Sequence, residues 1–143
     1  MTRPVIIALL CCLLFADWQS ANAAKLDELS LDRWAKLREV ERYQLKIAEK
    51  YYAERNYKVA LSEYEKFLEL YEQSVGAPYS QLKWGICLVR LKKLNTAVRD
   101  GFQSVIDYWP ESPEATAAAY YIGQTYKGMG EVRKAKRAYQ NVV

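Results

Sequence analysis

Small side chains recur along the chain at a spacing that no single helix or strand would produce. Each is followed three places later by a bulky apolar residue and twelve places later by an alanine. The three sets are Ala48, Tyr51 and Ala60; Gly85, Leu88 and Ala97; and Gly123, Tyr126 and Ala135. They begin 37 or 38 residues apart, a period that predicts stacked supersecondary units. Because a small residue lets two helices approach closely, the pattern predicts an array of helical hairpins.

The apolar stripe around the first small residue begins well before it. Trp34, Leu37 and Val40 extend the helical spacing backwards, and no glycine or proline occurs between Leu31 and Asn56. We therefore expect one long first helix. Its leading part, within residues 24–40, would cap the first hairpin or, alternatively, serve as a coiled-coil oligomerisation helix. The start of that stretch, residues 24–30, is expected to be a frayed lead-in.

The other two hairpins are bounded by residues that typically start and end helices. The second hairpin begins near Pro78 and turns around residues 92–94. Ser112 can cap the next helix, and Pro113 fits its first turn, where no amide donor is lost. Residues 128–130 form the third turn, where glycine suits the left-handed conformation of a helix end. The repeat domain is thus expected at 41–143, divided at about 41–77, 78–115 and 116–143.

This spacing resembles the tetratricopeptide repeat, in which an aromatic follows the second alanine by four places and an apolar residue follows by seven. Repeat one has Tyr64 and Phe67 there, and repeat three has Tyr139 and Val142. Repeat two departs from the motif with Gly101 and Ser104, and neighbouring Phe102, Val105 and Ile106 are expected to supply the bulk. The resemblance implies an all-α fold: a short right-handed solenoid of about three stacked antiparallel hairpins, the last one uncapped. It implies protein binding, since this scaffold serves many unrelated partners.

The junction between the second and third repeats indicates which type of tetratricopeptide protein the chain resembles. It reads Tyr108-Trp109-Pro110-Glu111-Ser112-Pro113-Glu114-Ala115. Similar junctions occur in repeat proteins of the bacterial envelope and periplasm. The resemblance therefore points to the envelope type of tetratricopeptide protein.

The amino terminus has the three parts of a secretory signal peptide. A short basic start with Arg3 precedes the apolar run 5–15, and Ala21-Asn22-Ala23 is a small-x-small cleavage site. We expect cleavage after Ala23, so that residues 1–23 are removed and the protein is secreted or periplasmic. A membrane anchor is the alternative, but the apolar run is much shorter than the roughly 20 residues of a spanning helix. Lipidation is not expected, because Cys11 and Cys12 lie inside the apolar run after bulky or thiol side chains.

Nothing in the composition favours catalysis. The chain has no histidine, which removes the commonest general base and the usual histidine metal ligand. We therefore expect no enzyme activity, cofactor or metal. Cys87 lies on an apolar helix and is expected to be a buried hydrophobe. The basic cluster Arg133, Lys134, Lys136 and Arg137 is expected to be a solvated face, with an acidic partner or anionic lipid as the alternative and no nucleic acid.

In the tetratricopeptide family, the first helix of each hairpin lines a concave groove. That resemblance implies twelve groove residues here: Arg42, Leu45, Glu49, Tyr52, Tyr79, Leu82, Ile86, Val89, Arg90, Tyr120, Gln124 and Lys127. An apolar floor with a charged rim suits an extended peptide or an amphipathic helix. The alternative is that Leu82, Ile86 and Val89 pack against a neighbouring repeat. Trp84, beside Gly85, is expected to be buried between hairpins.

The family's clamp for a carboxyl terminus is not matched, because Leu45 and Glu49 stand where its lysine and asparagine would begin. These features predict an exported adaptor that binds a protein or peptide partner without catalysis. The alternative is a recruiting or sensory amino-terminal part of a larger envelope enzyme or transport assembly. A structural oligomer built through the first helix is a third reading. Because the last hairpin ends at Val143 without a covering helix, we also expect further repeats or self-association.

Overall fold

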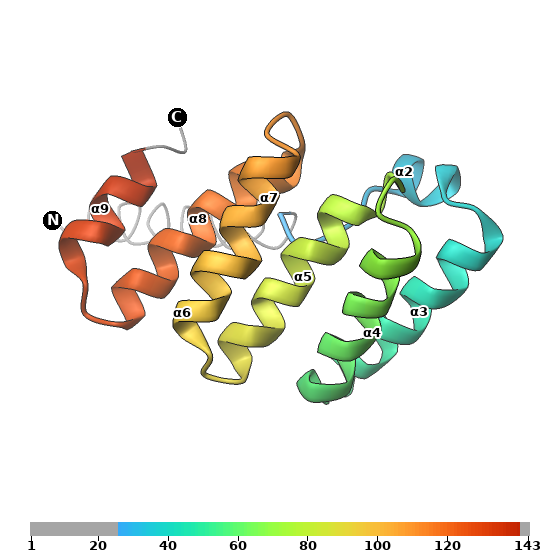
Figure 1. Cartoon of the computed structure of the whole chain (residues 1–143), viewed down its shortest axis with the longest axis horizontal. Helices are drawn as coiled ribbons and strands as arrows, with labels where there is room; N and C mark the ends of the chain where they lie inside the picture. Colours follow the sequence, from blue (N-terminus) through green and yellow to red (C-terminus); the bar gives the residue numbers. More distant parts are fainter. Residues whose placement is uncertain (1–25, 141–143) are drawn as a thin grey trace, which may run out of the picture.

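The computed structural model describes residues 26–140, and the predicted signal peptide lies outside them. Within these residues the helices pair as antiparallel hairpins that stack along the long axis of the molecule (Figure 1). The pairs are α3 (Glu39–Ala53) with α4 (Tyr57–Leu70), α5 (Ala77–Arg90) with the run α6 (Leu94–Thr96), η1 (Ala97–Phe102) and α7 (Gln103–Tyr108), and α8 (Pro113–Gly128) with α9 (Val132–Gln140). The all-α hairpin solenoid predicted from the repeat spacing is confirmed. No helix in the described part of the chain is long and apolar enough to cross a membrane.

Two buried clusters form the core, and α5 contributes to both. The first lies between α3, α4 and α5 and includes Leu45, Tyr64, Phe67 and Cys87; the second lies between α5, η1, α7 and α8 and includes Leu82, Phe102, Val105 and Ile122. Tyr52, Leu61 and Trp84 pack against both clusters. The hairpins therefore share one continuous apolar interior.

Two buried positions in α5 were predicted from sequence, with different outcomes. The Cys87 thiol is fully buried, as expected, and burial raises its pKa to about 12. Trp84 was expected to be buried, and it is partly buried, packing against both clusters. The prediction for Trp84 was therefore correct only in part, because the residue also lines the hollow between α4 and α7.

The second helix of the middle hairpin contains a π-helical segment, η1, which explains its departure from the repeat motif. A π turn holds one more residue than an α turn. The aromatic that follows Ala60 by four places, Tyr64, is therefore matched by Phe102, which follows Ala97 by five. Phe102 and Val105 are both fully buried, and Ile106 packs against the same cluster. These residues supply the bulk, as the sequence predicted.

Glycine is required where the two helices of a hairpin touch. A Cβ on Gly85 would lie 2.7 Å from Cε1 of Phe102, and a Cβ on Gly123 would lie 2.4 Å from Cε1 of Tyr139. Gly101 faces Gly85 directly, because a Cβ on Gly101 would come within 2.8 Å of the Gly85 Cα. The small positions of the repeat are therefore the places where an aromatic ring or a backbone lies against the first helix.

Each hairpin turn contains one residue in the left-handed conformation, at the same place in each repeat. Arg55 has φ 60°, Lys92 has φ 63° and Gly130 has φ 77°. Only the third turn uses glycine, the residue that tolerates this conformation without steric cost. The predicted caps are also present, since Ser112 Oγ accepts a hydrogen bond of 3.2 Å from the Ala115 amide and Pro113 begins α8.

The expected long first helix is wrong. The helix α2 (Leu31–Lys36) ends before Leu37 and Arg38, both of which have extended backbone, and α3 begins after them. Leu37 is buried in the first cluster, while Glu41 accepts hydrogen bonds from the Arg38 backbone and side chain at 2.6 and 3.0 Å. Burial of Leu37 and this capping interaction stabilise the break, although neither a glycine nor a proline marks it. A continuous oligomerisation helix is therefore not formed.

The chain before α2 is also ordered differently from the frayed lead-in that was expected. We call Leu26–Ser30 the N-terminal segment. Leu26 packs against the second cluster and Leu29 against the first. In Figure 1 this blue stretch passes behind α5 toward α2. The N-terminal segment is therefore packed against the solenoid and is not a frayed end.

Candidate functional site

A cavity of about 560 Å³ lies between α5 and α8, on the side of the hairpins where the groove was predicted. Five predicted groove residues line it: Ile86, Val89, Arg90, Tyr120 and Gln124. Asp27 and Tyr121, which were not in the prediction, line it as well. We call this space the α5–α8 cavity. The structure thus brings together the groove residues of the second and third repeats.

Several predicted groove residues belong to the core instead. Leu45 and Leu82 are fully buried, and Tyr79 and Ile86 are each 4% exposed. Leu82 and Ile86 pack against the neighbouring repeat, as the alternative interpretation proposed. A motif position specifies the side of a helix, but the contact between adjacent repeats covers part of that side. The prediction that Leu45, Leu82 and Tyr79 face a ligand is therefore wrong.

Two further groove residues lie away from the cavity. Arg42 turns back to the α2–α3 junction, where its guanidinium donates a hydrogen bond of 2.8 Å to the Leu37 carbonyl. Lys127 is exposed on α8 but does not line the α5–α8 cavity. The first repeat therefore contributes less to the site than the resemblance implied.

Glu49 and Tyr52 of the first repeat instead form a polar network beside the cavity. The Tyr79 hydroxyl donates a hydrogen bond of 2.8 Å to Glu49, and the Tyr64 hydroxyl donates to the same oxygen. Lys83, only 4% exposed, places its Nζ 4.0 Å from Glu49 and 3.5 Å from the centre of the Tyr52 ring. Burial raises the pKa of Tyr52 to about 12 and lowers the pKa of Lys83, an effect that Glu49 opposes.

The N-terminal segment inserts a carboxylate next to this network. The Tyr121 hydroxyl donates a hydrogen bond to Asp27 Oδ2, and its ring stacks on the buried Phe102 ring with centroids 5.4 Å apart. Burial raises the pKa of Asp27, while the Tyr121 hydrogen bond and the positive charges of Lys83 and Arg90 act in the opposite direction. The second and third hairpins thus hold an acidic side chain of the chain itself.

An ion pair also fixes the start of α2. Arg33 forms an ion pair with Glu114 in the first turn of α8 and donates a hydrogen bond of 2.8 Å to the Val75 carbonyl. Glu114 is almost completely buried. The chain is therefore anchored at Asp27 in the N-terminal segment and again, six residues later, at Arg33 in α2.

Among the residues of the site that sequence reasoning missed are Asp27, Lys83 and Tyr121. A lysine on a helix normally indicates a solvated position, so Lys83 gave no signal beyond its place between Leu82 and Trp84. Tyr121 lies next to a predicted groove tyrosine. Asp27 lies between Leu26 and Leu29, a spacing of apolar residues that could have indicated a packed segment.

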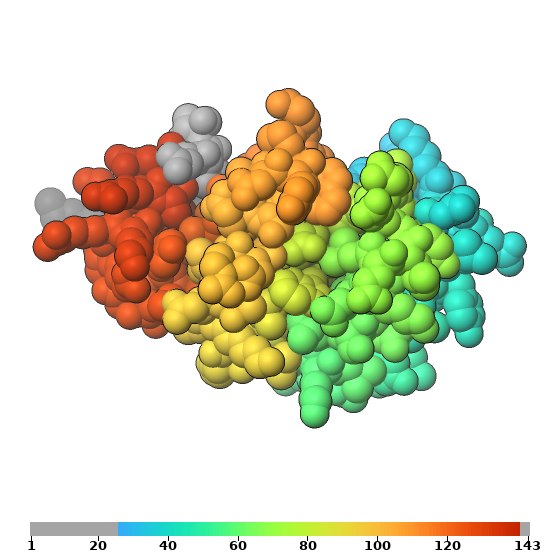
Figure 2. Space-filling view, in the orientation of Figure 1, coloured from blue at the N-terminus to red at the C-terminus, as the bar shows by residue number. Residues whose placement is uncertain are grey.

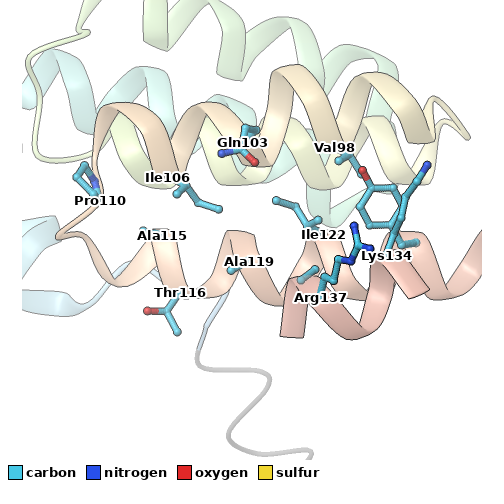
Figure 3. A pocket seen from close by; sticks show the side chains of 12 residues that line it. Val98, Gln103, Ile106, Pro110, Ala115, Thr116, Ala119, Ile122, Lys134 and Arg137 are labelled. Atoms are coloured by element: carbon cyan, nitrogen blue, oxygen red, sulfur yellow. The ribbon is translucent and has the colours of Figure 1, made fainter. Parts of the chain in front are cut away.

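Two more hollows lie on the opposite side, between successive second helices. One, between α4 and α7, has Trp84 and Trp109 in its lining and is visible in Figure 2. The other is a cavity of about 430 Å³ between η1, α7, α8 and α9. Figure 3 shows Ile106 and Ile122 pointing into it, with Lys134 and Arg137 at one end. Arg133, Lys136 and Arg137 are exposed on α9.

In the network beside the cavity, the carboxylates of Glu49 and Asp27 accept hydrogen bonds from tyrosine hydroxyls. Among the described residues, no group of three or more histidine, cysteine, aspartate or glutamate side chains is placed to hold a metal ion.

Comparison with known protein families supports the repeat assignment. A family model described as tetratricopeptide repeat matches residues 79–112 and 117–143, which cover the second and third hairpins. The match and the all-helical solenoid support the tetratricopeptide family, whose repeats form protein–protein interaction scaffolds. No curated protein matches the chain.

Proposed function

We propose that the chain is a non-catalytic adaptor of the bacterial cell envelope that binds a peptide or helix of a protein partner in its groove. The observation that carries this proposal is the α5–α8 cavity, where Val89, Arg90, Tyr120 and Gln124 present apolar, charged and amide groups together. Mixed apolar and polar linings of this kind suit peptide recognition. Tetratricopeptide repeats in the second and third hairpins support a scaffold role.

Site-specific photocrosslinking tests the groove. A photoreactive phenylalanine analogue at Gln124, exposed at the cavity, is compared with one at Lys136, exposed on α9 outside every cavity described above. We expect a discrete adduct with another protein from Gln124 in cells, and none from Lys136. Equal adducts at both positions, or none at Gln124, would contradict groove binding.

Export is the second part of the proposal. The basic start, the apolar run and the Ala21-Asn22-Ala23 site support it, and so does the resemblance of the 108–115 junction to those of envelope proteins. We expect protein recovered from the envelope fraction to have the intact mass of a chain that begins at Ala24. A mass that includes residues 1–23 would contradict cleavage and favour a membrane anchor.

A further inference from the structure

The N-terminal segment occupies the region that the proposed function assigns to a partner. Its two leucines reach both core clusters, Leu26 the second and Leu29 the first. Between them, Asp27 lines the α5–α8 cavity and accepts the Tyr121 hydrogen bond. A segment this short thus makes two apolar contacts and one polar contact with the solenoid.

The surroundings of Asp27 combine one hydrogen-bond donor with two positive charges. Lys83 and Arg90 both act electrostatically on Asp27. Glu49, whose carboxylate lies 4.0 Å from the Lys83 Nζ, already accepts hydrogen bonds from two tyrosines. The pKa of Asp27 is nonetheless raised, because burial outweighs the Tyr121 hydrogen bond and the positive charges of Lys83 and Arg90.

We propose that the N-terminal segment is a resident ligand of the groove, and that the partner binds through a short non-helical segment of the same chemistry. That chemistry is a carboxylate one place after one leucine and two places before another. The partner segment displaces Leu26–Ser30 and places its carboxylate at Tyr121, Lys83 and Arg90. This inference rests on the proposed function, because it names the kind of partner that the groove binds.

Because it is covalently attached, the resident segment competes strongly with a free segment for the same site in the groove. A ligand tethered by a short connection has an effective concentration in the millimolar range. The intact chain should therefore bind a free copy of the segment poorly, and weakening the resident copy should increase binding. This difference separates a displaceable ligand from a segment that is simply part of the fold.

The test uses a fluorescent synthetic peptide with the sequence of residues 24–31 and measures its binding to the full chain by fluorescence anisotropy. Asp27→Lys places a third positive charge beside Lys83 and Arg90 and should release the resident segment. Glu28→Lys makes the same change of charge one residue later, at an exposed position, and serves as the matched control. We expect at least tenfold tighter peptide binding by Asp27→Lys than by the unmodified chain or Glu28→Lys.

The peptide carries the reciprocal changes. A peptide with lysine at the Asp27 position should lose at least tenfold in affinity for the Asp27→Lys chain, whereas lysine at the Glu28 position should have little effect. Adding Tyr121→Phe to the Asp27→Lys chain should also weaken binding. Equal binding by all chains, or no discrimination between the two altered peptides, would overturn the proposal.

A second measurement keeps the test decisive if Asp27→Lys does not fold. Tyr121→Phe removes one hydroxyl and keeps the ring stacked on Phe102, and hydrogen–deuterium exchange then reports on residues 27–30. We expect these amides to exchange several-fold faster, with exchange in α5 and α8 unchanged. Unchanged exchange in the segment would contradict the role of Asp27 and Tyr121.

Crosslinking from Gln124 distinguishes failure of this inference from failure of the proposed function. If an adduct forms but Asp27→Lys does not increase its yield, the groove binds a partner by other chemistry and this inference fails. If the peptide discriminates as expected but no adduct forms in cells, the pocket recognises the segment chemistry and the adaptor function fails.

Discussion

The second and third hairpins have the same repeat spacing. In each, a glycine of the first helix lies against an aromatic ring of the second helix, but the surroundings of this contact differ. Gly85 lies against Phe102, which is fully buried and has α8 packed over it. Gly123 lies against Tyr139, which is only half-buried. The motif fixes which residues touch, whereas neighbouring elements decide how much that contact contributes to stability.

The largest expected effect comes from removing the two aromatic rings. Phe102→Ala should lower the free energy of unfolding by about 3–5 kcal/mol, because a fully buried ring leaves a cavity. Tyr139→Ala should cost less than half as much, since its ring is partly in water. Urea unfolding followed by circular dichroism measures both. Equal losses would show that the third hairpin is as well covered as the second.

The next largest difference in stability is expected between alanine substitutions of Gly85 and Gly123, the glycines that lie against the aromatic rings. Gly85→Ala pushes a methyl group against the Phe102 ring, while the Gly101 backbone lies 3.4 Å away on the same side, and overpacking of this kind costs about 1–3 kcal/mol. The three atoms nearest to a Cβ on Gly123 all belong to the Tyr139 ring, which is half-buried and can move outward. We expect a clearly smaller loss of thermal stability in the second variant, measured by calorimetry. A larger loss for Gly123→Ala would contradict the comparison.

In the hairpin turns, two substitutions are expected to change the stability of the protein in opposite directions. Lys92 adopts a left-handed conformation that costs a non-glycine residue about 1–2 kcal/mol. Because glycine also loses more chain entropy on folding, Lys92→Gly should stabilise the protein by no more than about 1 kcal/mol. Gly130→Ala should destabilise it by about the same amount. Urea midpoints of the two variants should therefore move in opposite directions, and movement in the same direction would refute the turn assignment.

The smallest expected effect is on pH dependence, at the carboxylate held between these two hairpins. Burial raises the pKa of Asp27 above its ordinary value of 3.8, so docking favours the protonated form. Its contribution to docking is therefore fully present below the ordinary pKa and falls as pH rises through the raised pKa. The charged and titratable groups that act on Asp27 are Lys83 and Arg90 from α5, Tyr121 from α8 and Glu28 beside it.

Amide exchange of residues 27–30 measures this pH effect, after correction for intrinsic exchange rates. We expect the segment to become better protected on acidification through the raised pKa, not released. Asp27→Asn cannot titrate and should show no change over the same range. Loss of protection as the pH falls would mean that the docked carboxylate is stabilised in its charged form.

The fold was largely predictable because its signals are local. Spacing of small and bulky residues identified the hairpins, and Ser112 and Pro113 marked the start of α8 through side-chain and backbone chemistry that acts within one turn. The break at Leu37 and Arg38 was not predictable in this way. It depends on burial of Leu37 against residues distant in sequence, and no helix-breaking residue marks it.

The site was less predictable than the fold. Val89, Arg90, Tyr120 and Gln124, which the resemblance implied as groove residues, do line one cavity. It could not show that a neighbouring repeat covers Leu82, because motif positions carry no information about burial between repeats. Nor could it reveal Asp27, whose place in the site depends on a contact with Tyr121 across most of the chain.

The π segment has a consequence for how repeats of this kind are aligned. The first and second small residues are 37 positions apart, and the second and third are 38 apart. The run Leu94–Tyr108 is one residue longer than α4, and the difference lies within η1. If Gly101 is treated as a one-residue insertion, Phe102 and Val105 fall on the motif positions and both intervals become equal. An alignment that allows gaps only in loops would therefore misplace every later residue of this helix, whereas one that allows a gap inside the helix recovers a uniform repeat.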